Sequence, residues 1–174
     1  MKVEALSGVQ VLTYKIQIDK RGSFRRIFDI SDLKSENLNF VQSSLSKNFL
    51  KGTVRGLHFQ TQPSVESKLV SCIKGRICDV LVDVRPSSKT YGSHMILDLR
   101  EDEPTGLLIP PGIAHGFQTL EDDTFVLYQM TDFFVPTLAV SLQWNDENLA
   151  IEWPLPCTNI SESDALGKKW PVSF

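Results

Sequence analysis

Two of the three histidines in this chain stand beside glycines that can bend a strand. His58 lies in the stretch VRGLHFQ (54–60), and His115 lies in PPGIAHGFQ (110–118). Histidine has a pKa near neutrality, so it can act as a general base, act as a general acid, or bind a metal ion. The third histidine, His94, lies in a strand-like stretch, and we expect it to be an ordinary core or surface residue.

The spacing of Arg55 and His58 points to an irregular strand. Strict alternation would place these two side chains on opposite faces. Gly56 stands between them, and a glycine-centred bulge or strong twist would direct both into one pocket. His115 follows a Pro-Gly turn, which would aim it into the mouth of a barrel. We therefore predict one pocket that contains both histidines and Arg55.

The elements that must position these residues are strands. Short runs rich in β-branched and aromatic residues alternate with turn signals about every ten residues, which is typical of an all-β sandwich or barrel. No repeat or linker divides residues 1–174, so we expect a single domain. The predicted strands are residues 9–17, 24–29, 53–60, 68–73, 76–85, 94–99, 106–109 and 124–131.

Helical signals are weak and confined to two places. Residues 30–37 can form a short turn, and residues 159–168 another, capped by Ser161 or Ser163. The composition becomes irregular after Trp153-Pro154, and we expect this tail to pack across the barrel as an arm.

The strand predicted at residues 76–85 has one wholly apolar face and one mixed face. The simpler interpretation, which we favour from this stretch alone, is a half-exposed strand. The alternative is a strand that lines a cavity, with Asp83 buried as a partner of a neighbouring functional group.

Charge and composition narrow the functional classes. Eighteen Lys and Arg face 21 Asp and Glu, giving a net charge of −3 without a basic block. Binding to nucleic acid or to a membrane is therefore not expected. The N-terminus has no signal-peptide pattern, and three cysteines make no disulfide framework, so we expect reduced thiols and a cytoplasmic protein.

A metal site is disfavoured by two residues. Metal-binding cupins, which are small jelly-roll barrels, carry a His-x-His pair, a glutamate before a glycine, and a histidine after a later Pro-x-Gly turn. This chain resembles that layout, but Gln60 stands at the second ligand position and Lys68 stands in the region of the glutamate. An ammonium group repels a divalent cation. We predict no metal and no other cofactor.

Five motifs in order resemble the dTDP-4-dehydrorhamnose 3,5-epimerase family, from about residue 19 to residue 164. The resemblance implies a jelly-roll (cupin-like) double-stranded β-helix barrel without metal, and a homodimer with exchanged N-terminal strands. It implies a nucleoside-diphosphate 4-keto-6-deoxyhexose as substrate and an epimerase of deoxysugar biosynthesis. The motifs are VRGLHFQ (54–60), KLVSCIKGRICDVLVDVRPSSKTYG (68–92), LLIPPGIAHGFQTL (107–120), FVLYQMTDFFVP (125–136) and IEWPL (151–155).

The same resemblance implies catalytic roles. The family's general base falls on His58, its tyrosine proton donor on Tyr128, and the aspartate that orients the base on Asp164. Lys68 falls on the lysine that would stabilise an enolate. The 4-keto group acidifies the C–H bonds at C3 and C5, which explains the need for a base with near-neutral pKa. Asp83 is a weaker candidate for a supporting partner.

Substrate-binding roles follow in the same way. The resemblance places binding residues at Arg21, Gln42 and His115, with Lys68 also in contact with substrate and Arg55 as an anchor. Several positions depart from the family pattern where the nucleotide would bind. These departures are Arg26 in place of a glutamate, Ser43-Ser44 in place of Asp-Asn, Ala139 in place of an acidic residue, and Phe133-Phe134 in place of two tyrosines.

The departures leave open whether the nucleotide is dTDP, CDP or GDP, and whether C3, C5 or both are inverted. Two other functions remain as alternatives. One is a nucleotide-sugar 3,4-ketoisomerase on the same barrel, although such relatives lack the tyrosine found here at Tyr128. The other is a non-catalytic sugar-binding cupin, which would not need an acid–base pair.

Overall fold

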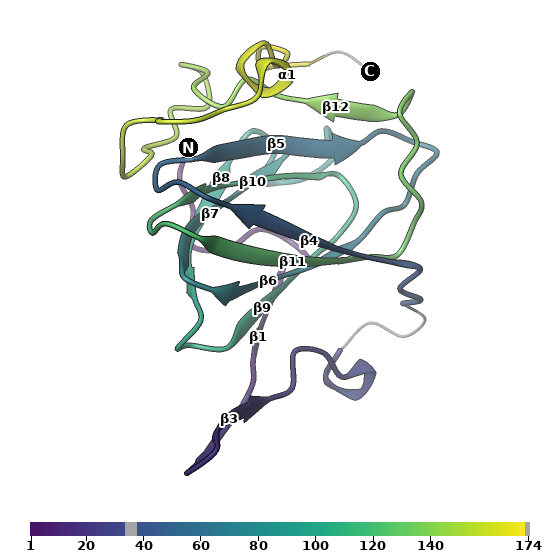
Figure 1. The fold of residues 1–174 in the computed structure, drawn as a ribbon. Helices are drawn as coiled ribbons and strands as arrows, with labels where there is room; N and C mark the ends of the chain where they lie inside the picture. The colour runs from purple at the N-terminus through teal and green to yellow at the C-terminus, as the bar shows by residue number, and fades with distance from the viewer. Residues whose placement is uncertain (34–37, 173–174) are drawn as a thin grey trace.

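Two five-stranded antiparallel sheets face each other and form the barrel (Figure 1). The structure, a computed structural model, describes residues 1–33 and 38–172. The fold is a jelly roll, which confirms the expected class. The first sheet has the order β1 (Gln10–Thr13), β9 (Thr105–Ile109), β6 (Lys68–Lys74), β11 (Thr124–Met130) and β4 (Gln42–Asn48). The second has the order β12 (Ala139–Ser141), β5 (Val54–Gln60), β10 (Ile113–Thr119), β7 (Arg76–Asp83) and β8 (His94–Arg100).

The strand pattern in the sequence predicted most of these elements. The run at residues 9–17 is divided into β1 and a separate strand, β2 (Ile16–Asp19). β10 is the strand that follows the Pro111-Gly112 turn, as expected. β4 and β12 were missed, because β4 reads QSSLSKN, with few β-forming residues, and β12 has only three residues.

The main core lies between the two sheets. It combines buried side chains of both, including Val70 and Val126 from the first sheet and Leu81 and Phe117 from the second. Each such side chain, fully removed from water, contributes roughly 1.5–3 kcal/mol. Tyr128 packs against this core and also belongs to a group of polar side chains between the sheets.

A second cluster covers the outer face of the second sheet. Val80 and Val82 of β7 pack there with Leu142, Leu149 and Trp170 of the C-terminal segment. The tail thus crosses the barrel as an arm, as predicted. It buries β7 on both faces, so the half-exposed strand that we favoured from the sequence is wrong. Periodicity within one strand does not reveal what a distant segment covers.

The C-terminal arm contains helix α1 (Glu162–Ala165). Ser161 is its N-cap, and the Ser161 side chain accepts a hydrogen bond from the backbone N–H of Asp164 at 3.2 Å. One of the two predicted caps is therefore confirmed. α1 has four residues, and the described part of the chain contains no helix of the length and apolarity needed to span a membrane.

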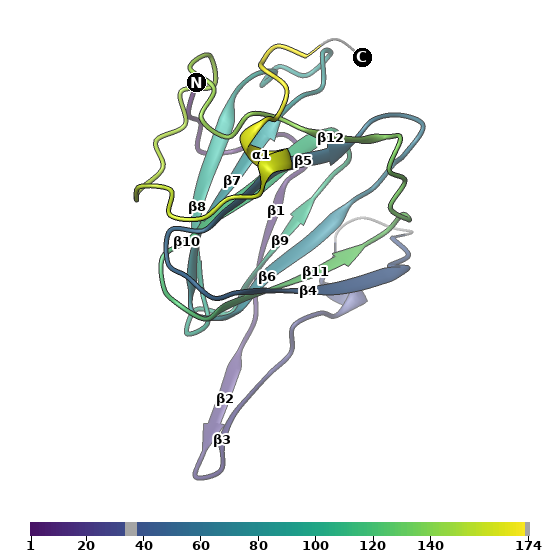
Figure 2. The ribbon, with the colours of Figure 1, turned by 45° about the horizontal axis from the view of Figure 1, so that its top comes forward.

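An N-terminal hairpin projects away from the barrel (Figure 2). It is formed by β2 and β3 (Gly22–Arg25) and exposes Ile18 and Phe24, at 79% and 69% of their surfaces. The Arg25 guanidinium anchors its base by donating a hydrogen bond to the carbonyl of Ile73 at 3.0 Å. The 3-10 helix η1 (Ile30–Asp32) follows, inside the helical turn predicted at 30–37; residues 34–37 lie outside the described residues.

Candidate active site

A bulge in β5 brings Arg55 and His58 to the same side of the strand. His58 pairs with His115 in β10, and Arg55 pairs with Phe117 of the same strand. The two residues are three positions apart in β5, whereas their partners are two positions apart in β10, so β5 contains one extra residue. Gly56 has φ +121°, and a Cβ there would lie 2.5 Å from the Cα of Gly116. Only glycine is tolerated at so close an approach in that backbone region. The bulge predicted from the sequence is confirmed.

The bulge opens a cavity of about 230 Å³ between the sheets. The residues that line it carry polar side chains and come from five strands of the two sheets. The lining residues are Ser46, Arg55, His58, Lys68, His115 and Tyr128. The structure thus brings together both histidines, Arg55, Lys68 and Tyr128, which sequence reasoning had selected separately.

Asp164 reaches the cavity from α1 and contacts His58. Its Oδ1 lies 2.7 Å from Nε2 of His58, and its Oδ2 accepts a hydrogen bond from the backbone N–H of Gly56 at 3.1 Å. Burial of the carboxyl would raise its pKa. The hydrogen bond and charge of His58, together with the Gly56 and Ser161 contacts, outweigh burial and lower the pKa of Asp164.

This arrangement orients His58 as a base. An ionised Asp164 accepts a hydrogen bond from Nε2–H, so Nδ1 is the ring nitrogen that is free to take a proton. The carboxylate also stabilises the imidazolium that would form. The His58 side chain is half exposed while Asp164 is buried, so the base faces the opening and its partner lies behind it.

A second buried pair joins His115 and Asp79. Nε2 of His115 lies 2.8 Å from Oδ2 of Asp79, and both side chains are almost fully inaccessible. Asp79 comes from β7, and sequence reasoning did not select it. The available signal was its position on the mixed face of the strand at 76–85, which is the face directed into the barrel.

Asp83, the aspartate that we did consider, does not support the site. Its carboxylate accepts hydrogen bonds from Arg85, Ser88 and Thr90 at the end of β7. Burial would raise the pKa of Asp83, but these hydrogen bonds outweigh it and hold the pKa at about 2. Asp83 is therefore buried in order to organise the turn after β7, and the partner of the cavity histidine is Asp79.

Tyr128 enters the cavity from β11 in the opposite sheet to His58. Its ring packs edge-on against His115, with centroids 5.7 Å apart. Burial, reinforced by the charge of Asp79, raises the pKa of Tyr128 above its ordinary value. The phenol is therefore protonated at neutral pH. Within the described residues its hydroxyl makes no hydrogen bond, which leaves it available to a ligand.

Two cations line the cavity, and each has a distinct partner. The Lys68 ammonium forms an ion pair with the carboxylate of Glu66. Nε of Arg55 donates a hydrogen bond to Oδ1 of Asn48 at 2.7 Å, and the Arg55 side chain lines the cavity. Sequence reasoning missed Glu66 and Asn48, because neither belongs to a motif.

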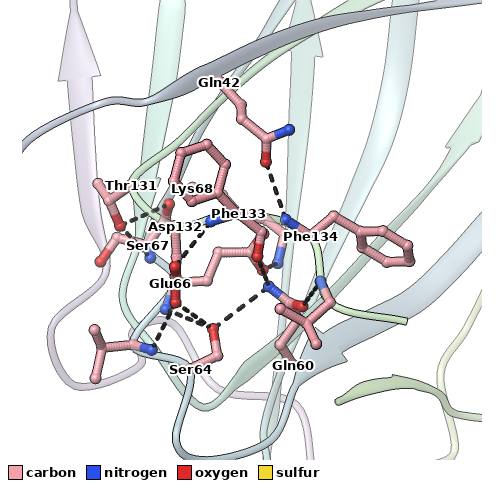
Figure 3. Close-up of polar contacts among 12 residues, drawn as sticks. Gln42, Gln60, Ser64, Glu66, Ser67, Lys68, Thr131, Asp132, Phe133 and Phe134 are labelled. Atoms are coloured by element: carbon pink, nitrogen blue, oxygen red, sulfur yellow. Dashed lines mark hydrogen bonds and ion pairs between the residues drawn. The ribbon is translucent and has the colours of Figure 1, made fainter. Parts of the chain in front are cut away.

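Gln42 and Arg21 lie outside the cavity itself. Gln42 begins β4 on the face that carries Ser46, and its Oε1 accepts a hydrogen bond from the backbone N–H of Phe134 at 3.1 Å (Figure 3). Arg21 is in the turn of the projecting hairpin, where it pairs with Asp19 at 2.6 Å. The structure therefore brings Gln42 to the neighbouring loop and does not bring Arg21 to the cavity of its own chain.

Gln60, at the position of a cupin metal ligand, is occupied elsewhere. Its Oε1 accepts a hydrogen bond from the N–H of Val135 at 2.7 Å, and its Nε2 donates to the carbonyl of Phe133 at 3.1 Å. Among residues 1–33 and 38–172, no cluster of three His, Cys, Asp or Glu side chains could hold a metal ion. Independence from metal remains a prediction, and the chemistry of the donors supports it.

The remaining histidine, His94, is a core residue as predicted. It is buried in β8, and burial lowers its pKa below the ordinary value. Its backbone pairs with the N-terminal segment through Met1 and Val3. It takes no part in the cavity.

Fold and cavity together define a jelly-roll isomerase that works by acid–base chemistry. One wall carries the imidazole of His58 with the carboxylate of Asp164, the facing wall carries the protonated phenol of Tyr128, and the cations Arg55 and Lys68 also line the cavity. These are the groups needed to move a proton on and off a carbon next to a carbonyl.

The chain belongs to the dTDP-4-dehydrorhamnose 3,5-epimerase family, whose model matches residues 4–171. It is 34% identical over 168 residues to the dTDP-4-dehydrorhamnose 3,5-epimerase of Shigella flexneri, covering 95% of this chain and 92% of that protein. A Legionella pneumophila dTDP-6-deoxy-D-glucose-3,5-epimerase in complex with dTDP-4-keto-L-rhamnose has a similar structure. Its TM-score is 0.89 at 34% identity, covering 96% of this chain and 90% of that one.

A more distant structural neighbour is a 3'-monoepimerase from Streptomyces bikiniensis in complex with dTDP-quinovose. Its TM-score is 0.88 at 25% identity, with 96% of this chain and 87% of that chain covered. Membership in the epimerase family favours an epimerase over the ketoisomerase and over the non-catalytic sugar-binding protein that the sequence had left as alternatives.

Proposed function

We propose that the protein inverts C3, C5 or both of a nucleoside-diphosphate 4-keto-6-deoxyhexose. The observation that carries this proposal is the placement of His58 on β5 and Tyr128 on β11, in facing sheets around one cavity. A sugar ring between them would have the base on one face and the acid on the other. Inversion needs that arrangement, because the proton must leave one face and return to the opposite one.

The chemistry begins with removal of the proton next to the ketone. Nδ1 of His58 takes the proton, and the C–H electron pair moves into an enolate whose charge rests on the C4 oxygen. Lys68 stabilises that oxygen, with Arg55 or His115 assisting, in a cavity where weak screening strengthens the attraction. Tyr128 then gives its proton to the opposite face of the carbon. Exchange of protons with solvent restores both residues.

The substrate's diphosphate would be held by cations. Arg55 lines the cavity, and Asn48 binds its Nε, so the two terminal nitrogens are the groups proposed to contact the diphosphate. Some observations favour thymidine as the nucleotide of the substrate, and others favour a different base. Relatives with bound dTDP-sugars favour thymidine. Arg26, which pairs with Asp29 at 2.6 Å, and the exposed Phe133-Phe134 pair replace family residues and favour another base.

A homodimer with exchanged hairpins is part of the proposal. The β2–β3 hairpin exposes Ile18 and Phe24 and carries Arg21 away from its own barrel (Figure 2). In such a dimer the second copy would cover Ile18 and Phe24, and the hairpin would bring Arg21 to the second copy's cavity. We also propose a cytoplasmic location, which the three unpaired cysteines support.

The test is an assay of dTDP-, CDP- and GDP-linked 4-keto-6-deoxyhexoses in D2O, followed by proton NMR. We expect deuterium at C3, C5 or both, together with the inverted product, for at least one nucleotide. The position of the label separates a 3-epimerase, a 5-epimerase and a 3,5-epimerase. If His58→Ala matches the wild type, or no sugar is labelled, the proposal is overturned.

A further inference from the structure

The ion pair between Glu66 and Lys68 is buried beside the cavity. Lys68 is the first residue of β6, and Glu66 lies two residues earlier in the preceding loop. The Lys68 side chain exposes only 14% of its surface, and the Glu66 side chain only 8%. Lys68 lines the cavity and Glu66 does not. Of this ion pair, the lysine is therefore the member that a ligand in the cavity would meet.

Glu66 is itself held by a polar network on the loop before β6 (Figure 3). Its backbone N–H donates to Oγ of Ser64 at 3.3 Å, and Oγ of Ser64 donates to Oδ2 of Asp132 at 2.8 Å. Asp132 also accepts hydrogen bonds from the N–H groups of Val65 and Phe133. The loop at 61–67 is thereby tied to the segment after β11.

A lysine in a cavity wall needs a hydrogen-bonding partner such as Glu66 if its ammonium group is to be held in one position. Its four-carbon stem has many rotamers, and ordering it has an entropic cost. One N–H bound to a buried carboxylate, on a residue whose backbone is held by the loop, restricts those rotamers and leaves two N–H groups for a ligand. The other cation at the cavity, Arg55, is held in the same manner by Asn48, which carries no charge.

We infer that Glu66 is a positioning residue for Lys68, holding its ammonium where it stabilises the enolate oxygen; this inference rests on the proposed function. Two effects of Glu66 oppose each other. Its negative charge weakens the field of the ammonium, and its hydrogen bond fixes the ammonium in place. Lys68 lines the cavity and Glu66 does not, so the ammonium is the nearer charge for a ligand there. Its attraction therefore prevails, and positioning decides the result.

A double-mutant cycle tests the inference. Glu66→Gln keeps the shape and removes the charge, and we expect kcat to fall about 10-fold while KM changes little, because the interaction acts in the transition state. Lys68→Met should lower kcat by about 10²-fold. The double variant should be no slower than Lys68→Met alone. Losses that multiply would overturn the inference, since Glu66 would then act independently of Lys68.

Two further variants separate positioning from folding. Glu66→Asp retains a carboxylate and should recover part of the lost kcat. Glu103→Gln removes a glutamate from an exposed ion pair with Arg100 and should leave kcat unchanged. If Glu66→Gln and Glu103→Gln are both as active as the wild type, Glu66 has no positioning role.

A measurement without substrate keeps this inference distinct from the proposed function. Competitive acetylation by acetic anhydride, read by peptide mass spectrometry, reports how accessible the Lys68 amine is. We expect labelling of Lys68 to rise several-fold in Glu66→Gln, with Lys51 as an exposed internal standard. Increased labelling without turnover of any 4-keto sugar would support the positioning contact and reject the epimerase proposal. Equal labelling in both proteins would reject the contact.

Discussion

Nε2 of His58 lies 2.7 Å from Oδ1 of Asp164, although the two residues are 106 positions apart in the chain. His58 belongs to the second sheet, and Asp164 belongs to the C-terminal arm that crosses it. The same carboxylate accepts the N–H of Gly56 at the bulge. One aspartate thus holds both the base and the backbone irregularity that directs the base into the cavity.

Loss of the Asp164 charge should impair catalysis more than folding. We expect Asp164→Asn to lower kcat/KM by about 10²-fold or more, because the amide neither fixes the His58 tautomer nor stabilises its imidazolium. The matched control is Ser161→Ala, which removes the cap of α1 and should cost about 1 kcal/mol of stability with little change in kcat. Steady-state kinetics and thermal unfolding of both variants check the prediction. Equal losses of activity would show that α1 acts only as a structural element.

The two proton transfers should fail in different ways. His58→Ala should abolish both turnover and deuterium incorporation from solvent, with a loss of at least about 10²-fold, because no enolate forms. Tyr128→Phe keeps the ring against His115 but deletes the donor. It should lose inverted product while still exchanging deuterium into the substrate, since His58 can return a solvent-derived proton to the original face.

Proton NMR in D2O follows both quantities in one sample. Wild-type epimerisation by Tyr128→Phe would show that water or another residue reprotonates the enolate. Exchange that survives in His58→Ala would remove His58 from the role of base.

Activity should not depend on a divalent metal. Gln60 is bound to the backbone of Phe133 and Val135, and the Lys68 ammonium faces the cavity near both imidazoles. We expect exhaustive EDTA treatment to leave kcat unchanged, because positive charge at a ligand position opposes cation binding. Metal analysis of the purified protein is the accompanying measurement. Inactivation by EDTA that a divalent ion reverses would contradict the prediction.

Exchange of hairpins predicts complementation between two inactive variants. Arg21→Ala should lose activity through the partner's site, and His58→Ala through its own. In a mixed dimer, the barrel of the Arg21→Ala chain receives the hairpin of the His58→Ala chain and has a complete site. We expect equal co-expression to recover about a quarter of wild-type activity, since about half of the dimers are mixed and each has one complete site. No recovery, with dimers present by ultracentrifugation, would contradict exchange.

Asp83 should make stability depend on pH at the acidic end. Its pKa of about 2 lies below the ordinary value, so its contribution is complete above about pH 4 and is lost as the pH falls toward 2. The difference corresponds to about 2 kcal/mol at neutral pH. Urea unfolding of Asp83→Asn should show this deficit at pH 7 and a shrinking one below pH 4. Asp98→Asn, in an exposed ion pair with Arg76, should show much less. A deficit independent of pH would contradict the assignment.

Much of the fold could be predicted from local pattern. The strands at β5, β6, β8 and β11 were bounded to within one or two residues, because their apolar and β-branched residues pack into the hydrophobic clusters on the two faces of the second sheet. The motifs around His58, His115 and Tyr128 indicated the family through residue types and spacing alone. β4 was missed because its inward face carries serine and asparagine, which serve the cavity and not the core.

What the sequence indicated by itself was a group of residues that share one cavity and the device that orients two of them. The group is Arg55, His58, Lys68, His115 and Tyr128. Gly56 between Arg55 and His58 indicated a bulge, because the backbone there must take a conformation that other residues avoid. The resemblance in sequence already implied the pairing of Asp164 with His58, whereas tertiary structure alone decided that Asp79 pairs with His115 and Glu66 with Lys68. These pairings depend on how the two sheets and the C-terminal arm close around one cavity. A charge pair forms where burial makes an unpaired charge costly, and burial is a property of the assembled barrel.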